Sequence, residues 1–338
     1  MSAESEVSPS KVAVVTGGSA GIGRATVRAF AAAGYDVAVL ARGRAGVDAT
    51  VAEVMAAGRR GLPAYVDVAD DDAVQAAADR IEAELGPIDV WVNSAFVGSL
   101  SYFWDTTPQE YRQMTEITYF GQVHGTRAAL RHMRPRDRGA IVNVSSAMAS
   151  RSIPLQSAYC GSKAAARAMT DSVLVELKAT GSRVTIGVVT LPGVNTTQFN
   201  WNLNRMPKHP QPVPPIVEPE VCARAIVFSA EHPRRNMWVG VSTAYTVLGN
   251  RIAPALVDWY LAKTGIGSQQ TDKTLPRWGS NVFAAQDEDT DRGARGGFAQ
   301  QAWSRDPVSF VARNRLASLG AAVGVLGSAA AVRRRHAA

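Results

Sequence analysis

Short runs of apolar and β-branched residues alternate along the chain with longer stretches of helix-forming residues. The first strands are predicted at Lys11–Val15 and Asp36–Leu40, and the Ala-rich stretch Arg24–Ala33 between them predicts a helix that ends before Gly34. Parallel strands need long crossover connections, usually helices, which cover both faces of the sheet. The alternation therefore predicts an α/β fold built on a doubly wound parallel sheet.

The same pattern continues to about residue 264. Further strands are predicted at 62–66, Ile88–Asn93, Ala140–Val144, Arg183–Thr190 and Met237–Val241, and further helices at 47–57, 70–85, Pro108–Met133, Tyr159–Ala179, Pro219–Ser229 and Ala253–Lys263. Six prolines within 194–219 interrupt the pattern and predict an ordered flap with extended pieces, because proline forbids a helix there. We therefore predict one main domain over 11–264, preceded by a polar tail at 1–10.

The composition changes beyond Lys263. Residues 265–306 are rich in Gly, Gln, Asp and Arg, which predicts a polar linker, and 307–338 form a basic and apolar C-terminal tail. Within this tail, Leu316–Val332 carries no charge over 17 residues and has arginines on both sides, but it is short for a membrane-spanning helix. Three interpretations of 316–335 stay open: association with a membrane surface, packing on another subunit, and a disordered tail.

The net charge of +7 suggests a nucleic-acid or membrane partner. Residues 301–338 carry six Arg and one Asp, however, and residues 265–300 carry four basic and five acidic residues. The main domain is therefore only mildly basic and shows no nucleic-acid-binding motif, so no nucleic-acid partner is predicted. The polar N-terminus does not resemble a signal peptide, and the two cysteines fit reduced thiols, which predicts a cytoplasmic protein.

A glycine-rich turn joins the first predicted strand to the first helix. It reads Thr16-Gly17-Gly18-Ser19-Ala20-Gly21-Ile22-Gly23. In a doubly wound sheet this turn binds the pyrophosphate of a dinucleotide, because glycines allow close approach of the backbone and the helix N-terminus offers N–H groups. A purely structural turn is the alternative. We predict cofactor contacts at Gly17, Ser19, Gly21, Ile22 and Gly23.

Tyr159 and Lys163 are four residues apart and therefore share one face of the predicted helix. A phenol is a weak acid or base at neutral pH, and a nearby ammonium group stabilises its phenolate. Ser146 follows the strand Ala140–Val144, at the carboxyl edge of the sheet where ligands bind, with Ser145 as the second candidate. Such a set suits proton transfer to or from a substrate oxygen that the serine hydroxyl orients.

The glycine spacing T-G-x-x-x-G-x-G and the Ser146, Tyr159 and Lys163 set together resemble the short-chain dehydrogenase/reductase family over residues 11–250. The resemblance implies a Rossmann fold, hydride transfer between a nicotinamide cofactor and a small-molecule alcohol or carbonyl substrate, and a homo-oligomer. It makes Ser146, Tyr159 and Lys163 the catalytic residues, of which Tyr159 and Lys163 also contact the cofactor.

The resemblance implies further cofactor contacts after the later strands. These lie at Asp67, Val68, Asn93, Ala95, Pro192, Gly193, Thr196 and Thr197. Three positions depart from the family pattern: Ser94 and Phe96 replace Asn and Gly, and Thr118 replaces an asparagine. The backbone carbonyl of that asparagine usually holds a water molecule that links the lysine to solvent.

The second strand ends in Ala41-Arg42-Gly43-Arg44, without a carboxylate. A carboxylate there would bind the ribose hydroxyls of NAD, whereas an arginine accommodates the 2′-phosphate of NADP. We therefore predict NADP(H) in preference to NAD(H), with Arg42 as the phosphate ligand and Arg44 as the second candidate. If both arginines are solvated loop residues, no such preference is expected.

The sequence thus predicts an NADP(H)-dependent oxidoreductase that interconverts an alcohol and a ketone or aldehyde, with Tyr159 as general acid and base. A catalytically weak NADP(H) sensor is the main alternative, and an epimerase or dehydratase is a third. The five histidines show no metal-ligand spacing, so no metal is predicted. Phe199, Trp201 and Met206 predict either a partly apolar substrate or packing of the flap on the domain.

Overall fold

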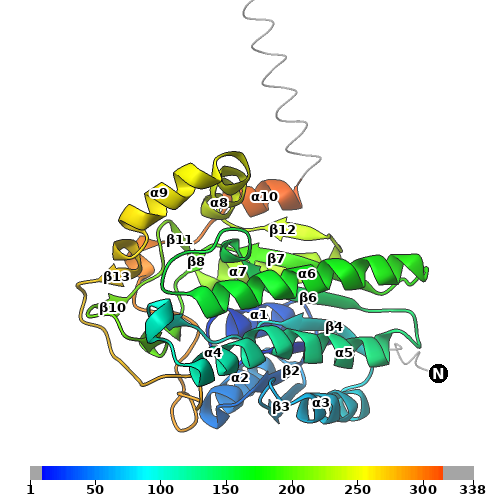
Figure 1. Cartoon of the computed structure of the whole chain (residues 1–338). Helices are drawn as coiled ribbons and strands as arrows, with labels where there is room; N and C mark the ends of the chain where they lie inside the picture. Colours follow the sequence, from blue (N-terminus) through cyan, green and yellow to red (C-terminus); the bar gives the residue numbers. More distant parts are fainter. Residues whose placement is uncertain (1–9, 315–338) are drawn as a thin grey trace, which may run out of the picture.

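The computed structural model describes residues 10–314. Its centre is a seven-stranded, fully parallel sheet in the order β12-β7-β6-β4-β1-β2-β3 (Figure 1). The strands are β1 (Val12–Thr16), β2 (Asp36–Ala41), β3 (Gly61–Tyr65), β4 (Ile88–Asn93), β6 (Ala140–Ser146), β7 (Thr185–Leu191) and β12 (Asn236–Trp238). The strand order reverses between β1 and β4, so the predicted doubly wound Rossmann fold is confirmed.

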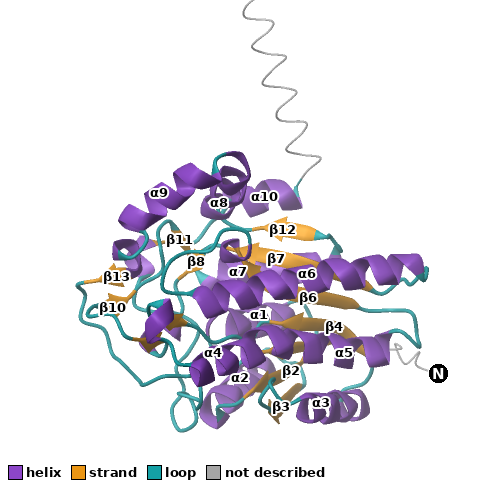
Figure 2. Cartoon of the chain, in the orientation of Figure 1, coloured by secondary structure: helices purple, strands orange, loops and turns teal. Residues whose placement is uncertain are grey.

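Helices cover both faces of this sheet (Figure 2). One face carries α1 (Gly21–Ala32), α2 (Arg44–Ala56) and α7 (Pro219–Glu231), and the other carries α3 (Asp71–Glu84), α4 (Pro108–Thr115), α5 (Gly121–Met133) and α6 (Ser157–Ala179). A π-helical turn at Glu116–Phe120 joins α4 to α5, so the helix predicted over Pro108–Met133 is continuous.

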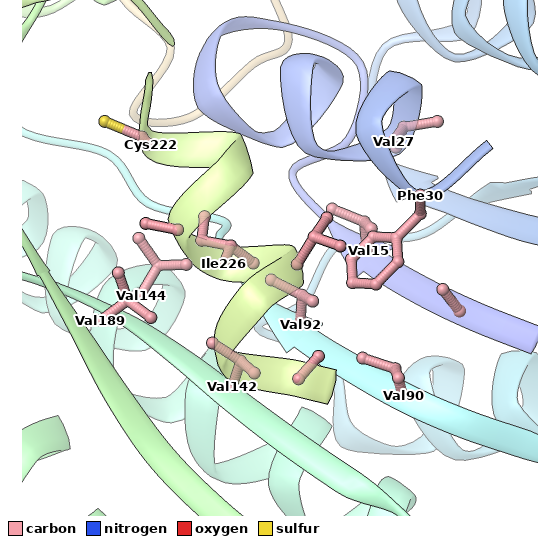
Figure 3. Close-up of a cluster of buried hydrophobic side chains, with 14 of the residues drawn as sticks. Val15, Val27, Phe30, Val90, Val92, Val142, Val144, Val189, Cys222 and Ile226 are labelled. Atoms are coloured by element: carbon pink, nitrogen blue, oxygen red, sulfur yellow. The ribbon is translucent and has the colours of Figure 1, made fainter. Parts of the chain in front are cut away.

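The core between the sheet and the α1–α7 layer is built from strand valines and a few larger side chains (Figure 3). Val15, Val92 and Val144 come from three neighbouring strands and meet Phe30 of α1 and Ile226 of α7. A second core fills the opposite face. Burial on both faces explains why the strands are continuous apolar runs, and it fixes the register that brings their carboxyl ends to one edge.

Short elements build the carboxyl edge of the sheet and the flap. They comprise the strands β5 (Ser99–Leu100), β8 (Gly193–Val194), β9 (Leu203–Asn204), β10 (His209–Pro210) and β11 (Ile216–Val217), and 3-10 turns at Phe103–Asp105, Ala147–Ala149 and Thr197–Asn200. β9 pairs with β5 and β11 pairs with β8. The prolines thus leave extended pieces in the flap, as its composition predicts.

The segment 265–306 is not the linker that its composition predicts. It packs along the main domain, where β13 (Gln270–Thr271) pairs with β10 and β14 (Ala302–Trp303) pairs with β11. Val282, Ala294 and Phe298 are buried. The average composition of the segment does not reveal these buried side chains. A few apolar residues that each contact the domain are enough to hold an otherwise polar segment in place.

Three helices follow the sheet or end the described chain: α8 (Val241–Ile252), α9 (Pro254–Thr264) and α10 (Pro307–Arg313). The strand predicted to end at Val241 already ends at Trp238, and Val241 begins α8, whose β-branched residues and glycine concealed its helical pattern. Within residues 10–314, no helix has the length and apolarity needed to cross a membrane. The predictions for residues 1–9 and for Leu316–Val332 lie outside the described residues.

Candidate active site

Two connected clefts open at the carboxyl edge of the sheet. The first lies over the glycine turn, where a doubly wound sheet binds its ligand. It is lined by these predicted residues: Gly17, Ser19, Gly21, Ile22, Gly23, Arg42, Asp67, Val68, Ala95, Thr196 and Thr197. The second cleft is lined by Ser146, Tyr159, Lys163, Pro192 and Gly193. Ile22, Phe96 and Thr196 line both, so the two clefts are continuous.

The glycine turn forms a cradle that has no room for side chains. Gly17 has a φ of +66°, and a Cβ there would lie 2.8 Å from the Cα of Ala95. A Cβ at Gly23 would lie 2.0 Å from the carbonyl oxygen of Gly17. The helix behind the turn, α1, has no side-chain cap and no acidic residue in its first turn. Its N-terminus therefore suits an anionic group such as a pyrophosphate.

Ser146, Tyr159 and Lys163 meet in the second cleft. β6 extends two residues beyond its predicted end, so Ser146 is the last residue of the strand and lies opposite Leu191 of β7. Tyr159 and Lys163 lie in the first two turns of α6, and both line the second cleft together with Ser146. The Nζ of Lys163 donates to the carbonyl oxygen of Val144 at 2.8 Å.

The surroundings of these groups shift their protonation in opposite ways. Burial raises the pKa of the Tyr159 hydroxyl well above the usual value, and the neighbouring Ser146 side chain opposes that change. Burial lowers the pKa of Lys163 to about 7. The cleft therefore contains a protonated phenol beside an amine that gains or loses its proton near neutral pH, which is a pair suited to proton transfer.

Comparison with known proteins agrees with this geometry. Residues 11–208 match the family described as short chain dehydrogenase. The chain belongs to the short-chain dehydrogenase family. It is 30% identical over 331 residues to the uncharacterised oxidoreductase YxnA of Bacillus subtilis, an alignment that covers 96% of this chain and 91% of YxnA. The similarity therefore includes the C-terminal segment beyond the family match.

Solved structures of short-chain dehydrogenases superpose on this one. An enzyme from Streptomyces avermitilis gives a TM-score of 0.63 at 28% identity, over 76% of this chain and 98% of that chain. An alcohol dehydrogenase from Thermococcus sibiricus, complexed with 5-hydroxy-NADP, gives a TM-score of 0.59 at 25% identity, over 68% of this chain and 95% of that chain. A short-chain dehydrogenase from Mycobacterium paratuberculosis, bound to NAD, gives a TM-score of 0.57 at 25% identity, over 65% of this chain and 90% of that chain. This chain is accordingly an NAD(P)-dependent oxidoreductase.

Two departures of this short-chain dehydrogenase from the family pattern have a structural account. Phe96 does not need the conformation of glycine, because only Asp137 and Leu155 among the non-glycine residues of 10–314 have positive φ. Its ring lies edge-on to Tyr159 at 5.6 Å, and the Nζ of Lys163 lies 5.6 Å from the ring centre. Phe96 thus gives the Lys163 ammonium an aromatic neighbour.

Thr118, the other departure, is buried in the π-helical turn between α4 and α5. Its Oγ1 donates to the carbonyl oxygen of Val97 at 3.0 Å and accepts from the N–H of Val97 at 3.1 Å. The threonine side chain therefore joins the helix to the segment that follows β4. This contact holds the cleft wall in place. It uses only the threonine hydroxyl, so the backbone carbonyl of residue 118 does not take part in it.

Asn93 lies apart from the other predicted residues. Its side chain is fully buried behind β4, where Oδ1 accepts from the indole N–H of Trp91 at 2.8 Å and Nδ2 donates to Asn143 Oδ1 at 2.8 Å. It lines neither cleft. The cofactor contact of Asn93 therefore stays a prediction, and the hydrogen bonds of its amide give it a positioning role at the carboxyl end of β4.

One part of the first cleft was missed by sequence reasoning. Residues 278–298, here called the C-terminal strap, run along it, and the cleft is lined there by Asn281, Ala285, Gln286 and Asp287. Arg24 of α1 is buried and forms ion pairs with Asp291 of the strap and with Glu53. Arg42 donates to the carbonyl oxygen of Asn281. The strap has no periodic pattern, and its acidic run at 287–289 was the only local signal.

Asp287 of the strap places a carboxylate at the end of β2. Its side chain is 5% exposed, and a Cβ at Gly43 would lie 1.9 Å from its Oδ1. Its Oδ2 is buried and has no hydrogen-bond partner within residues 10–314. The strap also occupies the N-terminus of α2, where Ala45 N–H donates to the Glu288 carbonyl at 2.9 Å and Gly46 N–H donates to the Asp287 carbonyl at 3.1 Å.

Proposed function

We propose that this protein is an NADP(H)-dependent dehydrogenase that interconverts an alcohol and a ketone or aldehyde. The observation that carries the proposal is the meeting of Ser146, Tyr159 and Lys163 in one cleft that is continuous with the glycine cradle. When bound, the nicotinamide supplies or accepts a hydride at the carbon that bears the substrate oxygen. The protein supplies the accompanying proton and orients the oxygen.

Each catalytic side chain has one role in this proposal. In reduction, the Tyr159 hydroxyl donates its proton to the carbonyl oxygen, and in oxidation the phenolate takes the alcohol proton. The ammonium form of Lys163, four residues further along α6, stabilises the phenolate that each reduction leaves. The Ser146 hydroxyl donates a hydrogen bond to the substrate oxygen, on which negative charge develops in the transition state.

The cofactor would lie along both clefts. Gly17, Gly21 and Gly23 would surround the pyrophosphate, and Asp67 and Val68 would contact the adenine. Thr196 and Thr197 would contact the nicotinamide half, where the Thr197 hydroxyl is buried and has no hydrogen-bond partner within residues 10–314. This orphaned hydroxyl supports a polar ligand at the junction of the clefts.

The preference for NADP(H) rests on Arg42. It lines the first cleft, and its Nη1 is buried without a hydrogen-bond partner in the described chain, although it lies 3.7 Å from a carboxylate oxygen of Asp67. A guanidinium so placed suits a 2′-phosphate. The negative charge of the Asp287 carboxylate would repel the 2′-phosphate of NADP(H) and so opposes this preference. We therefore infer that the strap limits discrimination between NADP(H) and NAD(H).

The second cleft favours a partly apolar substrate. Beyond the catalytic residues, it is lined by Met148, Gln156, Phe199, Asn202, Gln211, Pro212 and Val213. Phe199 contributes to this wall while packing against Phe298 of the strap, with ring centres 5.8 Å apart. Trp201 lines the first cleft and packs against Trp278, and Met206 lines neither cleft. Of these three flap residues, only Phe199 is therefore proposed to face the substrate.

The test is NADPH oxidation over a panel of ketones and aldehydes, with calorimetric titration of NADP⁺ in parallel. Tyr159→Phe is expected to lower kcat by about 10²–10⁴-fold while NADP⁺ affinity changes little, because the variant lacks only the proton donor. Tyr260→Phe, on the exposed α9 helix, is the matched control and should keep full activity. Tight NADP⁺ binding without turnover of any carbonyl, or an active Tyr159→Phe variant, would refute the proposal.

A further inference from the structure

The helix α8 turns apolar side chains outward along one face. Exposed residues recur at the helical spacing i, i+4, i+7 and i+11, and they are Val241, Tyr245, Leu248 and Ile252. Ile252 is 82% exposed. The opposite face buries Thr243 and Val247 against the domain. This reverses the usual pattern of a surface helix, whose outward face is polar.

The next helix, α9, contains no buried residue, although most of its residues are apolar. Leu256, Trp259 and Tyr260 are each more than half exposed, and the Lys263 ammonium lies 4.2 Å from the Trp259 ring centre. α8 packs against α9 and against α10, where Phe310 and Val311 are exposed as well. Figure 1 shows the three helices grouped at one end of the molecule. We call their exposed apolar side chains the apolar cap.

We propose that the apolar cap docks on an anionic lipid surface, with its side chains inserted at the level of the headgroups. The first argument is its composition. Trp and Tyr side chains favour the membrane interface because their rings are apolar and their N–H or O–H groups stay hydrated. The cap combines Trp259, Tyr245 and Tyr260 with aliphatic side chains, a composition that is typical of a surface that lies at a membrane interface.

The second argument is charge. The three helices carry Arg251, Lys263 and Arg313, and their one acidic residue, Asp258, forms an ion pair with Arg151. The cap is therefore surrounded by net positive charge, which attracts the negative headgroups of anionic lipids. A second copy of the chain on this surface would instead bring arginines and lysines of the same sign together, which disfavours a self-association interface.

The third argument is where the described chain ends. Asn314 directly follows α10, so residues 315–338 continue from the edge of the cap. Their sequence contains the uncharged run Leu316–Val332 and then three arginines, Arg333–Arg335. Stable attachment of a protein to a membrane surface generally needs two signals. The cap and this basic, apolar sequence would supply these two signals.

The experiment is co-sedimentation of the full chain with vesicles, together with quenching of its tryptophan fluorescence by brominated phosphatidylcholine. We expect binding to vesicles that contain phosphatidylserine, and at least tenfold weaker partitioning for the Ile252→Ser, Trp259→Ser double variant. The matched control is Trp104→Ser, which changes an exposed tryptophan in the 3-10 turn Phe103–Asp105, before α4, rather than in the cap. Trp259→Phe should remove most of the quenching, whereas Trp104→Phe should leave it unchanged.

Three results would overturn the proposal. One is the absence of binding to anionic vesicles. Another is binding that neither the double variant nor Trp259→Phe alters, which would assign attachment to residues 315–338 alone. The third is a dimer in solution that the double variant converts to a monomer, because the cap would then be an interface between copies of this chain. Circular dichroism of each variant verifies that the fold is intact.

Discussion

Replacement of Lys163 by methionine is expected to stabilise the cofactor-free protein while abolishing its activity. Lys163 is 2% exposed, and burial lowers its pKa from 10.5 to about 7. At about 1.4 kcal/mol per pH unit, this difference corresponds to a cost of about 5 kcal/mol for keeping the charged form buried. Methionine has a similar length and no charge, so the variant avoids this cost.

The substitution loses little in return. The hydrogen bond from Nζ to the Val144 carbonyl contributes about 1 kcal/mol, and that carbonyl still accepts from the side-chain amide of Gln122 at 3.1 Å. No buried polar group is left without a partner. The variant is therefore expected to be more stable than the wild type by about 2–4 kcal/mol at pH 6.5.

The pH dependence of the stability difference between the two proteins shows whether the buried lysine causes it. Between the folded pKa of about 7 and the unfolded value of 10.5, the unfolded wild-type chain holds a proton that the folded chain has released. Wild-type stability therefore rises with pH over this range. The variant has no titrating group at position 163, so it lacks this contribution to the pH dependence of stability. The advantage of Lys163→Met is largest below pH 7 and should fall by about 1.4 kcal/mol per pH unit above it.

Urea unfolding of both proteins, without cofactor and at several pH values between about 6.5 and 9.5, measures this difference. Lys178→Met, at an exposed position near the end of the same helix, is the control and should show no pH-dependent gap. If Lys163→Met were less stable than the wild type at pH 6.5, or if the gap did not change with pH, the assignment of a buried, low-pKa lysine would be refuted.

Three further predictions concern the cleft and its supports. Asp287→Asn should raise the ratio of kcat/KM for NADPH to that for NADH about tenfold, because it removes a negative charge near Arg42; a lower ratio would contradict this role. Asp291→Asn should weaken NADP⁺ binding in calorimetry about three- to tenfold by loosening the strap from Arg24, whereas the exposed Asp289→Asn should not. Gly125→Ala should lower the free energy of urea unfolding by about 1–3 kcal/mol, since its Cβ would lie 2.1 Å from Asn93 Oδ1; wild-type stability would disprove that close approach.

The features that the sequence predicted best are those with a local physical cause. The strand Ile88–Asn93 has the predicted ends, because a strand buried on both faces is a continuous apolar run. The glycine turn was found because only residues without a Cβ fit its close approach to Ala95. The pairing of Tyr159 and Lys163 on one face follows from the pitch of a single helix.

The features that the sequence did not predict depend on contacts between distant parts of the chain. Asp287 lies beside Gly43, and Arg24 pairs with Asp291, yet hundreds of residues separate each pair in the sequence. No periodicity records such contacts. The same reason explains why helix α8 was missed. Only Thr243 and Val247 are buried in it, and two inward residues do not form a recognisable helical pattern without the domain against which they pack.

The sequence by itself therefore determined the doubly wound sheet, the glycine turn and the placement of Ser146, Tyr159 and Lys163 at one edge, because hydrophobic periodicity and glycine geometry are local properties. The tertiary structure alone decided that a polar C-terminal segment closes one side of the cofactor cleft and places a carboxylate near Arg42. It also decided which helices keep an apolar face uncovered. Both outcomes depend on which surfaces meet in three dimensions, and that is set by packing of the whole chain.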